Sequence, residues 1–245
     1  MSIKTFELIS TTENGIQLIS YVALPENVAD NKPVAGVLVA PEWWGLAEHS
    51  KNITERLAEA GYAAVAMDIY GEGKLTSDAA MANMWMEQVL EDQDMLMARC
   101  RLILNDFSDQ LAVDSDKLAA IGYCFGGKIV LDMAREGMPL KAVATFHGNP
   151  EPKQPADNKF KAKVLVAHGR DDSMVSMEAI ESLKKELDAA EVDYTIDVYD
   201  DAKHGFTNPT ADERGAKNNV DLGYNETAAM QSWDNMLEFM KNNLS

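Results

Sequence analysis

A cysteine between two glycines is the side chain of this sequence best suited to covalent chemistry. Cys124 lies at the centre of Gly122-Tyr123-Cys124-Phe125-Gly126, between the apolar run 118–121 and a helical pattern that begins near Gly126. A strand, a tight turn and a helix in this order form the context of a nucleophile elbow. Such a turn is strained, so the positions two before and two after the nucleophile must lack bulky side chains. The pattern therefore predicts a thiol nucleophile at Cys124.

The position of Cys124 at the head of a helix favours its reactive form. The helix dipole and the backbone amides of the first turn stabilise a thiolate, which is the nucleophilic species. The backbone N–H of Phe125 would then point at the oxyanion that forms when a carbonyl is attacked. The alternative is that Cys124 is only a small buried residue before a glycine-rich helix start. Cys100 lacks the glycine pattern, and we expect both cysteines to be free thiols.

An aspartate pair and a histidine follow two later strands. The run 164–167 leads into Asp171 and Asp172, and the run 195–199 leads into His204. The order nucleophile, acid, histidine, each at a strand end, predicts His204 as the base that serves the thiol. Side chains of neighbouring residues cannot both face one imidazole. The spacing favours Asp172 as the acid and leaves Asp171 as the alternative, since Asp171 could instead stabilise the turn.

The loop Pro41-Glu42-Trp43-Trp44-Gly45 is expected to supply further groups. It follows a buried strand, at the point where this order of elements provides a second oxyanion amide, and the backbone N–H of Trp43 is the candidate. A glutamate between an apolar strand and two tryptophans is poorly solvated, which suits Glu42 to exchange a proton with a thiol. The alternative is a surface carboxylate with no such role.

Short apolar runs alternate with longer amphipathic runs, which is the pattern of strands interleaved with crossover helices. The expected strands cover 15–24, 34–40, 62–67, 118–122, 141–146, 163–168 and 194–199, and the expected helices cover 49–60, 126–135, 177–190 and 224–242. The methionine-rich segment 77–108 is expected to form one helix or two, which either line an apolar pocket or pack on the core. We predict a single α/β domain over 1–245, with a mostly parallel sheet flanked by helices on both faces. Its ligand crevice is expected at the carboxyl ends of the strands.

The composition argues against several classes of partner. The 245 residues include 40 acidic and 22 basic side chains, a formal net charge of -18, which would repel nucleic acid and anionic lipid. The first residues lack the pattern of a secretory signal, and no apolar run reaches membrane-spanning length, so a cytoplasmic protein is expected. The four histidines lack metal-site spacing, and His147 and His168 are expected to be hydrogen-bonded groups at strand ends. No metal or cofactor is predicted, and we expect a monomer or small homo-oligomer that acts on a small molecule.

Five motifs give the sequence a resemblance to the dienelactone hydrolase family. They are Pro41-Glu42-Trp43-Trp44-Gly45-Leu46, Asp68-Ile69-Tyr70-Gly71, Gly122-Tyr123-Cys124-Phe125-Gly126-Gly127, Gly169-Arg170-Asp171-Asp172 and His204-Gly205-Phe206. The resemblance spans nearly the whole chain and implies an α/β-hydrolase fold. It also implies a triad of Cys124, Asp172 and His204, with Glu42 as the group that takes the thiol proton when substrate arrives.

The resemblance implies hydrolysis of a lactone or activated ester through an acyl-enzyme, without a cofactor. The alternatives are a general carboxylesterase or thioesterase of the same fold, and a catalytically silent binding protein. Dienelactone hydrolase itself binds its substrate's carboxylate with arginines after the Asp-x-Tyr strand and just beyond the triad histidine. Here the segments 71–98 and 206–209 contain no arginine, and Lys74 is expected to be an exposed loop residue. The resemblance therefore supports the chemistry without specifying dienelactone as the substrate.

Overall fold

Strands with almost no exposed side chains form the centre of each part of this protein. The computed structural model describes residues 2–26, 28 and 32–245, and the chain divides into two units, Met1–Ala120 and Ile121–Ser245. Strand β5 (Val113–Tyr123) begins in the first unit and ends in the second. The single domain over 1–245 stays a prediction.

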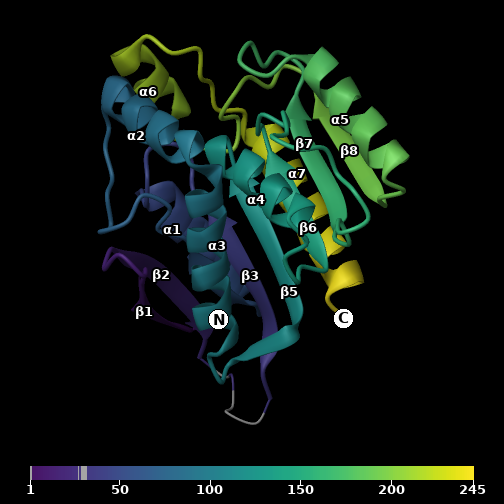
Figure 1. Ribbon diagram of the computed structural model, residues 1–245. Helices are drawn as coiled ribbons and strands as arrows, with labels where there is room; N and C mark the ends of the chain where they lie inside the picture. The colour runs from purple at the N-terminus through teal and green to yellow at the C-terminus, as the bar shows by residue number, and fades with distance from the viewer. Residues whose placement is uncertain (1, 27, 29–31) are drawn as a thin grey trace. The chain divides into compact units, whose positions relative to one another are not determined.

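The sheet of the first unit starts with an antiparallel hairpin and continues with parallel strands. β1 (Ile3–Thr11) pairs with β2 (Gln17–Pro25), β2 is antiparallel to β4 (Ala63–Ala66), and β4 is parallel to β3 (Val34–Ala40). The sequence of β3 is apolar throughout, as expected for a parallel strand that is covered on both faces. Helix α3 (Gln93–Ser108) lies in front of these strands in Figure 1 and α1 (Glu48–Glu59) lies behind them.

The second unit extends the same arrangement with parallel strands. β6 (Ala142–Phe146), β7 (Lys163–Gly169) and β8 (Tyr194–Tyr199) pair in parallel. Within this unit, α4 (Phe125–Arg135) and α5 (Met177–Ala189) lie in front of the strands in Figure 1, and α7 (Glu226–Asn243) lies behind them. The strand order is β1-β2-β4-β3-β5-β6-β7-β8. The predicted α/β class, with a mostly parallel sheet flanked by helices on both faces, is confirmed.

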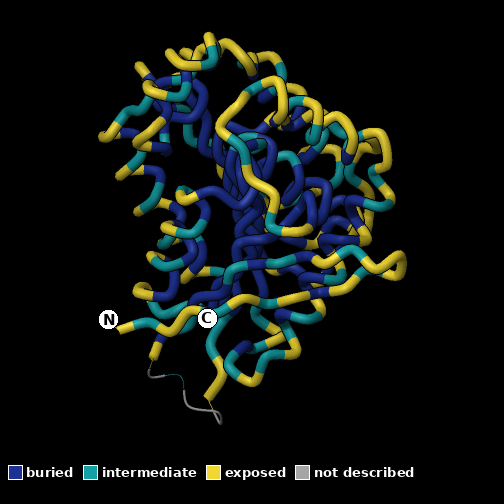
Figure 2. The backbone as a smooth tube through the Cα atoms, turned by 90° about the vertical axis from the view of Figure 1, so that its left-hand side faces the viewer, coloured by how far each residue is buried: buried dark blue, intermediate teal, exposed yellow. Residues whose placement is uncertain are grey.

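Two elements were not predicted, and both are largely exposed. β1 has a mixed burial pattern in which only Ser10 is buried, so its sequence lacks a clear apolar alternation. The short helix α6 (Ala211–Asn218) buries only Ala211 and Gly215. Figure 2 shows the contrast between such exposed segments and the buried central strands. Within the described residues, no helix combines the length and apolar character needed to cross a membrane.

The methionine-rich segment forms two helices, α2 (Ala79–Glu91) and α3. Asp92 leaves the helical conformation, and its carboxylate accepts a hydrogen bond of 2.9 Å from the backbone N–H of Met95, which caps α3. In α2 the side chains of Met81 and Met84 are about two-fifths exposed. Their part in a substrate pocket stays a prediction.

A buried carboxylate anchors the loop that follows β4. Asp68 is 1% exposed. Its Oδ1 accepts a hydrogen bond from the Gly71 N–H at 2.8 Å, and its Oδ2 accepts from the N–H groups of Ile19 and Gly73 at 2.8 and 2.7 Å. Burial raises the pKa of Asp68, while these N–H donors lower it. One side chain thereby joins β2 to the chain beyond β4.

The substitution Asp68→Asn should lower the free energy of unfolding by about 2 kcal/mol or more, because an amide nitrogen cannot accept the bonds that a carboxylate oxygen accepts. Urea denaturation would measure the loss. Asp78→Asn is the matched control, since the exposed Asp78 caps α2 and asparagine caps a helix equally well. Equal stability of the two variants would contradict the anchoring role of Asp68.

Candidate active site

The chain turns sharply at the end of β5, and Cys124 occupies the turn. Its φ of 52° and ψ of -115° lie outside the regions that non-glycine residues favour. A Cβ atom on Gly122 would lie 2.0 Å from the backbone oxygen of Gly126, and one on Gly127 would lie 2.4 Å from Oγ1 of Thr145. Only glycine therefore fits at either position. The structure has the strand, turn and helix that the sequence predicted around Cys124, with Phe125 as the first residue of α4.

The end of β6 holds the backbone of the turn in place. The N–H of Cys124 lies 2.9 Å from the backbone oxygen of Phe146 and 3.1 Å from Nδ1 of His147, and both atoms accept from it. Since Nδ1 accepts, the proton of a neutral imidazole is on Nε2, which lies 2.9 Å from Oγ1 of Thr207. His147 is thus a hydrogen-bonded group at a strand end, as expected, but sequence reasoning missed its contact with the cysteine. Strand periodicity alone gave no signal for that contact.

Asp172 and His204 meet in the second unit. Oδ2 of Asp172 lies 2.9 Å from Nδ1 of His204, and both side chains are buried. Oδ1 accepts hydrogen bonds of 2.9 Å from the N–H groups of Met174 and Val175, which fixes the orientation of the carboxylate. Asp171 is exposed, and its backbone N–H donates to the oxygen of Ala202. Of the two neighbouring aspartates, the structure places Asp172 against the imidazole.

The charges around His204 favour its protonated form. Burial alone would lower its pKa, but Cys124 and Asp172 outweigh burial and raise the pKa to about 10. Nε2 is buried, and a side-chain hydrogen bond with Cys124 is among the interactions that raise the pKa. The ring of His147 is 5.0 Å from that of His204, in an edge-to-face arrangement. The arrangement is suited to a pair formed by an imidazolium and a thiolate.

This raised pKa has a defined consequence for stability. An imidazole with the ordinary pKa of 6.5 that reaches about 10 in the folded protein binds its proton more tightly when folded. The resulting stabilisation is fully present below pH 6.5 and is lost as the pH rises through about 10.

The ¹⁵N chemical shifts of the histidine rings should show His204 protonated up to a pH of about 10. Cys124→Ala should lower this pKa, because the cysteine makes the largest contribution that raises it. His168 is the internal reference, since burial lowers its pKa, and it should stay neutral over the same range. Titration of His204 near pH 6.5 in the unmodified protein would rule out the proposed ion pair.

Glu42 and Trp43 lie in the first unit, in the loop after β3. Glu42 is buried at 8% exposure, so it is not the surface carboxylate that was the alternative. The backbone oxygen of Trp43 accepts a hydrogen bond of 2.9 Å from the hydroxyl of Tyr70. Gly45 has a φ of 85°, and a Cβ atom there would lie 2.1 Å from the backbone oxygen of Lys74. The loop conformation therefore depends on glycine, and the roles of Glu42 and Trp43 toward Cys124 stay predictions.

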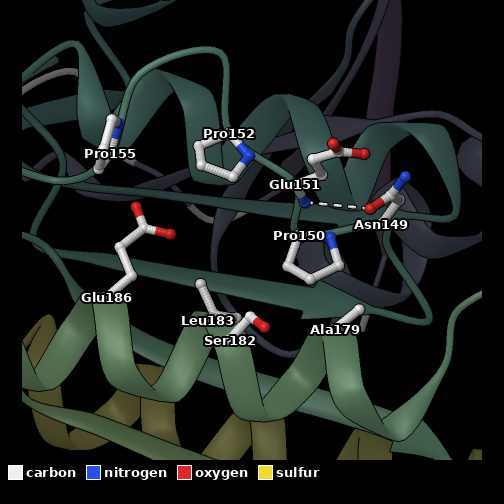
Figure 3. Close-up of a pocket in the computed structure, with 9 residues that line it drawn as sticks. All are labelled: Asn149, Pro150, Glu151, Pro152, Pro155, Ala179, Ser182, Leu183 and Glu186. Carbon is white, nitrogen blue, oxygen red and sulfur yellow. Dashed lines mark hydrogen bonds between the residues drawn. The ribbon is translucent and has the colours of Figure 1, made fainter.

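A groove of about 430 Å³ lies between α5 and the proline-rich loop of the second unit (Figure 3). Oε1 of Glu186 accepts from Nε of Arg135 at 2.8 Å and from the N–H of Ala156 at 2.7 Å, and Oε2 accepts from Nη2 of Arg135 at 2.9 Å. The carboxylate on the α5 side is therefore already satisfied. No histidine or cysteine lines this groove, and we assign it no part in the chemistry.

The strand order and the elbow at Cys124 define the class of the protein as an α/β-hydrolase. Residues 18–244 match the model of the dienelactone hydrolase family. The chain belongs to this family and is a hydrolase.

Curated relatives agree with this assignment. A protein of Salmonella typhimurium named "Putative carboxymethylenebutenolidase" is 30% identical, with 95% of this chain and 85% of that protein covered. A protein of the same name from Synechocystis is 26% identical and is covered over 99% of its length, with 100% of this chain.

Solved structures are similar over the entire chain. The dienelactone hydrolase-like promiscuous phosphotriesterase P91, from metagenomic libraries, has a TM-score of 0.92 and 32% identity, with 100% of both chains covered. A protein called m3DLH has a TM-score of 0.93 and 34% identity, again with 100% of both chains covered. These similarities extend from the sheet to both termini.

Proposed function

We propose that this protein hydrolyses lactones or activated esters through an acyl-enzyme on Cys124. The observation that carries the proposal is the contact of 2.9 Å between Asp172 and His204, on a histidine whose pKa Cys124 raises. A thiol nucleophile suits activated carbonyl groups, because thiolate is a better leaving group than an amide nitrogen. The relatives that are named as carboxymethylenebutenolidases support a lactone or ester as the substrate class.

In the proposed first half of the reaction, the thiolate of Cys124 attacks the carbonyl carbon and forms a C–S bond. The carbonyl oxygen becomes an oxyanion, which the backbone N–H groups of Phe125 and Trp43 stabilise. When the tetrahedral intermediate collapses, the C–O bond to the alcohol breaks, and the alkoxide takes the proton of the His204 imidazolium. An acyl-thioester and a neutral His204 result, with Asp172 holding the ring in orientation.

In the second half, His204 accepts a proton from water as the water attacks the thioester carbonyl. The C–S bond then breaks, the acid leaves, and the thiolate and imidazolium are restored together. Glu42 is proposed to take the thiol proton where Cys124 begins as a neutral thiol, and to return it at the end of the cycle. We place this activity in the cytoplasm, on a small molecule, in a monomer or small homo-oligomer.

The absence of arginine from 71–98 and 206–209 leaves the acyl group open within this class. A general carboxylesterase or thioesterase uses the same residues on other acyl groups. A silent binding protein would keep the pocket without turnover. A panel of lactones, aryl esters and thioesters separates these functions, and inactivity on every member would favour the binding protein.

Cys124→Ala should reduce turnover of aryl acetates and lactones by about 10³-fold or more, because no other group in the proposed mechanism can form the acyl-enzyme. Cys100→Ala is the control, since Cys100 is fully buried in α3, and it should keep the activity. Iodoacetamide should likewise alkylate Cys124 faster than Cys100, as followed by peptide mass spectrometry. Undiminished turnover in Cys124→Ala would overturn the assignment of the nucleophile.

The pair Asp172→Asn and Asp171→Asn tests the orienting acid with one and the same chemical change. Asp172→Asn should lower kcat by about two to four orders of magnitude, because an amide cannot hold the imidazole in its protonated, oriented form. Asp171→Asn should leave kcat nearly unchanged, since that side chain is exposed. Steady-state kinetics on an aryl ester would measure both, and a larger loss in Asp171→Asn would reverse the assignment.

A further inference from the structure

We propose that a groove between α3 and the turn that joins β1 to β2 binds a small carboxylate with an apolar body. The groove has a volume of about 420 Å³, and the residues that line it all belong to the first unit. None of them is among the residues of the proposed reaction. The volume falls within the usual range of small-molecule sites.

A buried arginine supplies the positive charge of the groove. Arg99 lines it and is 8% exposed. Its Nη1 donates to the backbone oxygens of Ile69 and Tyr70 at 2.9 and 3.0 Å. Nε is buried without a hydrogen-bond partner, and Arg99 forms no ion pair with any carboxylate in the part of the chain that the structure describes. The edge of the guanidinium formed by Nε and Nη2 is therefore unused.

A buried guanidinium nitrogen that donates no hydrogen bond lowers the stability of the folded protein. Burial lowers the pKa of Arg99, and the nearby Asp68 opposes this only in part, since its own oxygens accept from backbone N–H groups. A guanidinium stays charged in proteins, so it cannot relieve the cost by losing its proton. A carboxylate matches the fork of two parallel N–H donors. In the proposed complex, a carboxylate in the groove would supply the acceptor that Nε of Arg99 lacks.

The other residues that line the groove indicate what the part of the ligand beyond its carboxylate is like. Met95, Ala98 and Leu102 come from one side of α3 and form an apolar wall. Glu13 also lines the groove and is exposed and negatively charged. Together with the net charge of -18, it disfavours a dianion such as phosphate more than a monoanion. A monocarboxylate with a short hydrocarbon chain fits both the cation and the wall.

The test uses hexanoate as the probe and the ¹³C-methyl signal of Met95 as a local reporter, assigned from the spectrum of Met95→Leu. Hexanoate should shift this signal in a saturable manner. Hexan-1-ol, which has the same chain without the charge, should shift it little, and inorganic phosphate should not displace hexanoate. Since the reporter lies in the groove, the result does not depend on whether Cys124 is the nucleophile.

Two variants define the contacts. Arg99→Met should weaken hexanoate binding by about tenfold or more, the effect expected for a lost hydrogen bond to a charged group. Because that change also removes the bonds to Ile69 and Tyr70, Ala98→Phe serves as a second variant. It fills the groove from an exposed helix position and should abolish the Met95 shift while Arg99 remains. A Met95 signal that ignores hexanoate, answers hexan-1-ol equally, or still responds in Ala98→Phe would overturn the proposal.

Discussion

The backbone conformation at Cys124 is the constraint on which the proposed chemistry depends. A positive φ at a non-glycine residue costs free energy and persists only where the surroundings enforce it. Here they do so from both sides. A Cβ atom on Gly122 would lie 2.0 Å from the backbone oxygen of Gly126, so the turn requires glycine there. On the other side, the backbone oxygen of Phe146 accepts a hydrogen bond from the Cys124 N–H. The result is a thiol at the first turn of α4, where the helix dipole favours negative charge.

The position of Cys124 affects the protonation of His204 in the same unit. A fully buried imidazole normally loses its proton, yet the pKa of His204 rises to about 10 because two acidic groups act on it. Asp172 can serve as one of them only because the N–H groups of Met174 and Val175 hold its other oxygen. The carboxylate is thereby oriented toward the ring. The strained turn positions Cys124, and the hydrogen bonds of the next loop position Asp172. Both residues raise the pKa of His204.

Most of this was predictable from local patterns, and the exceptions share a cause. Buried strands such as β3 and β6 were predictable from their apolar runs, and the turn at Cys124 was predictable from the glycines around it. Spacing favours Asp172 over Asp171, and Asp172 is the one that lies 2.9 Å from the His204 ring; its role as the orienting acid stays a prediction. By contrast, β1 and α6 have too few buried side chains for a periodic signal. The contact of His147 with the Cys124 amide and the approach of the β1–β2 turn to Arg99 join residues far apart in sequence. Such contacts leave no trace in local spacing.

Catalysis and substrate choice draw on different parts of the chain. The residues of the proposed triad lie at the ends of strands, and the sheet fixes the positions of those strand ends. It thereby also fixes the geometry of the turn at Cys124. Side chains that bind a substrate often lie on the segments between strands, whose sequences can vary without disturbing the strands. The segment 206–209 contains no arginine, and neither does the segment 71–98, which includes α2 and the start of α3. The arginine that first follows this stretch, Arg99, donates through Nη1 to the oxygens of Ile69 and Tyr70. Membership of the family therefore predicts the reaction far more strongly than it predicts the acyl group that undergoes it.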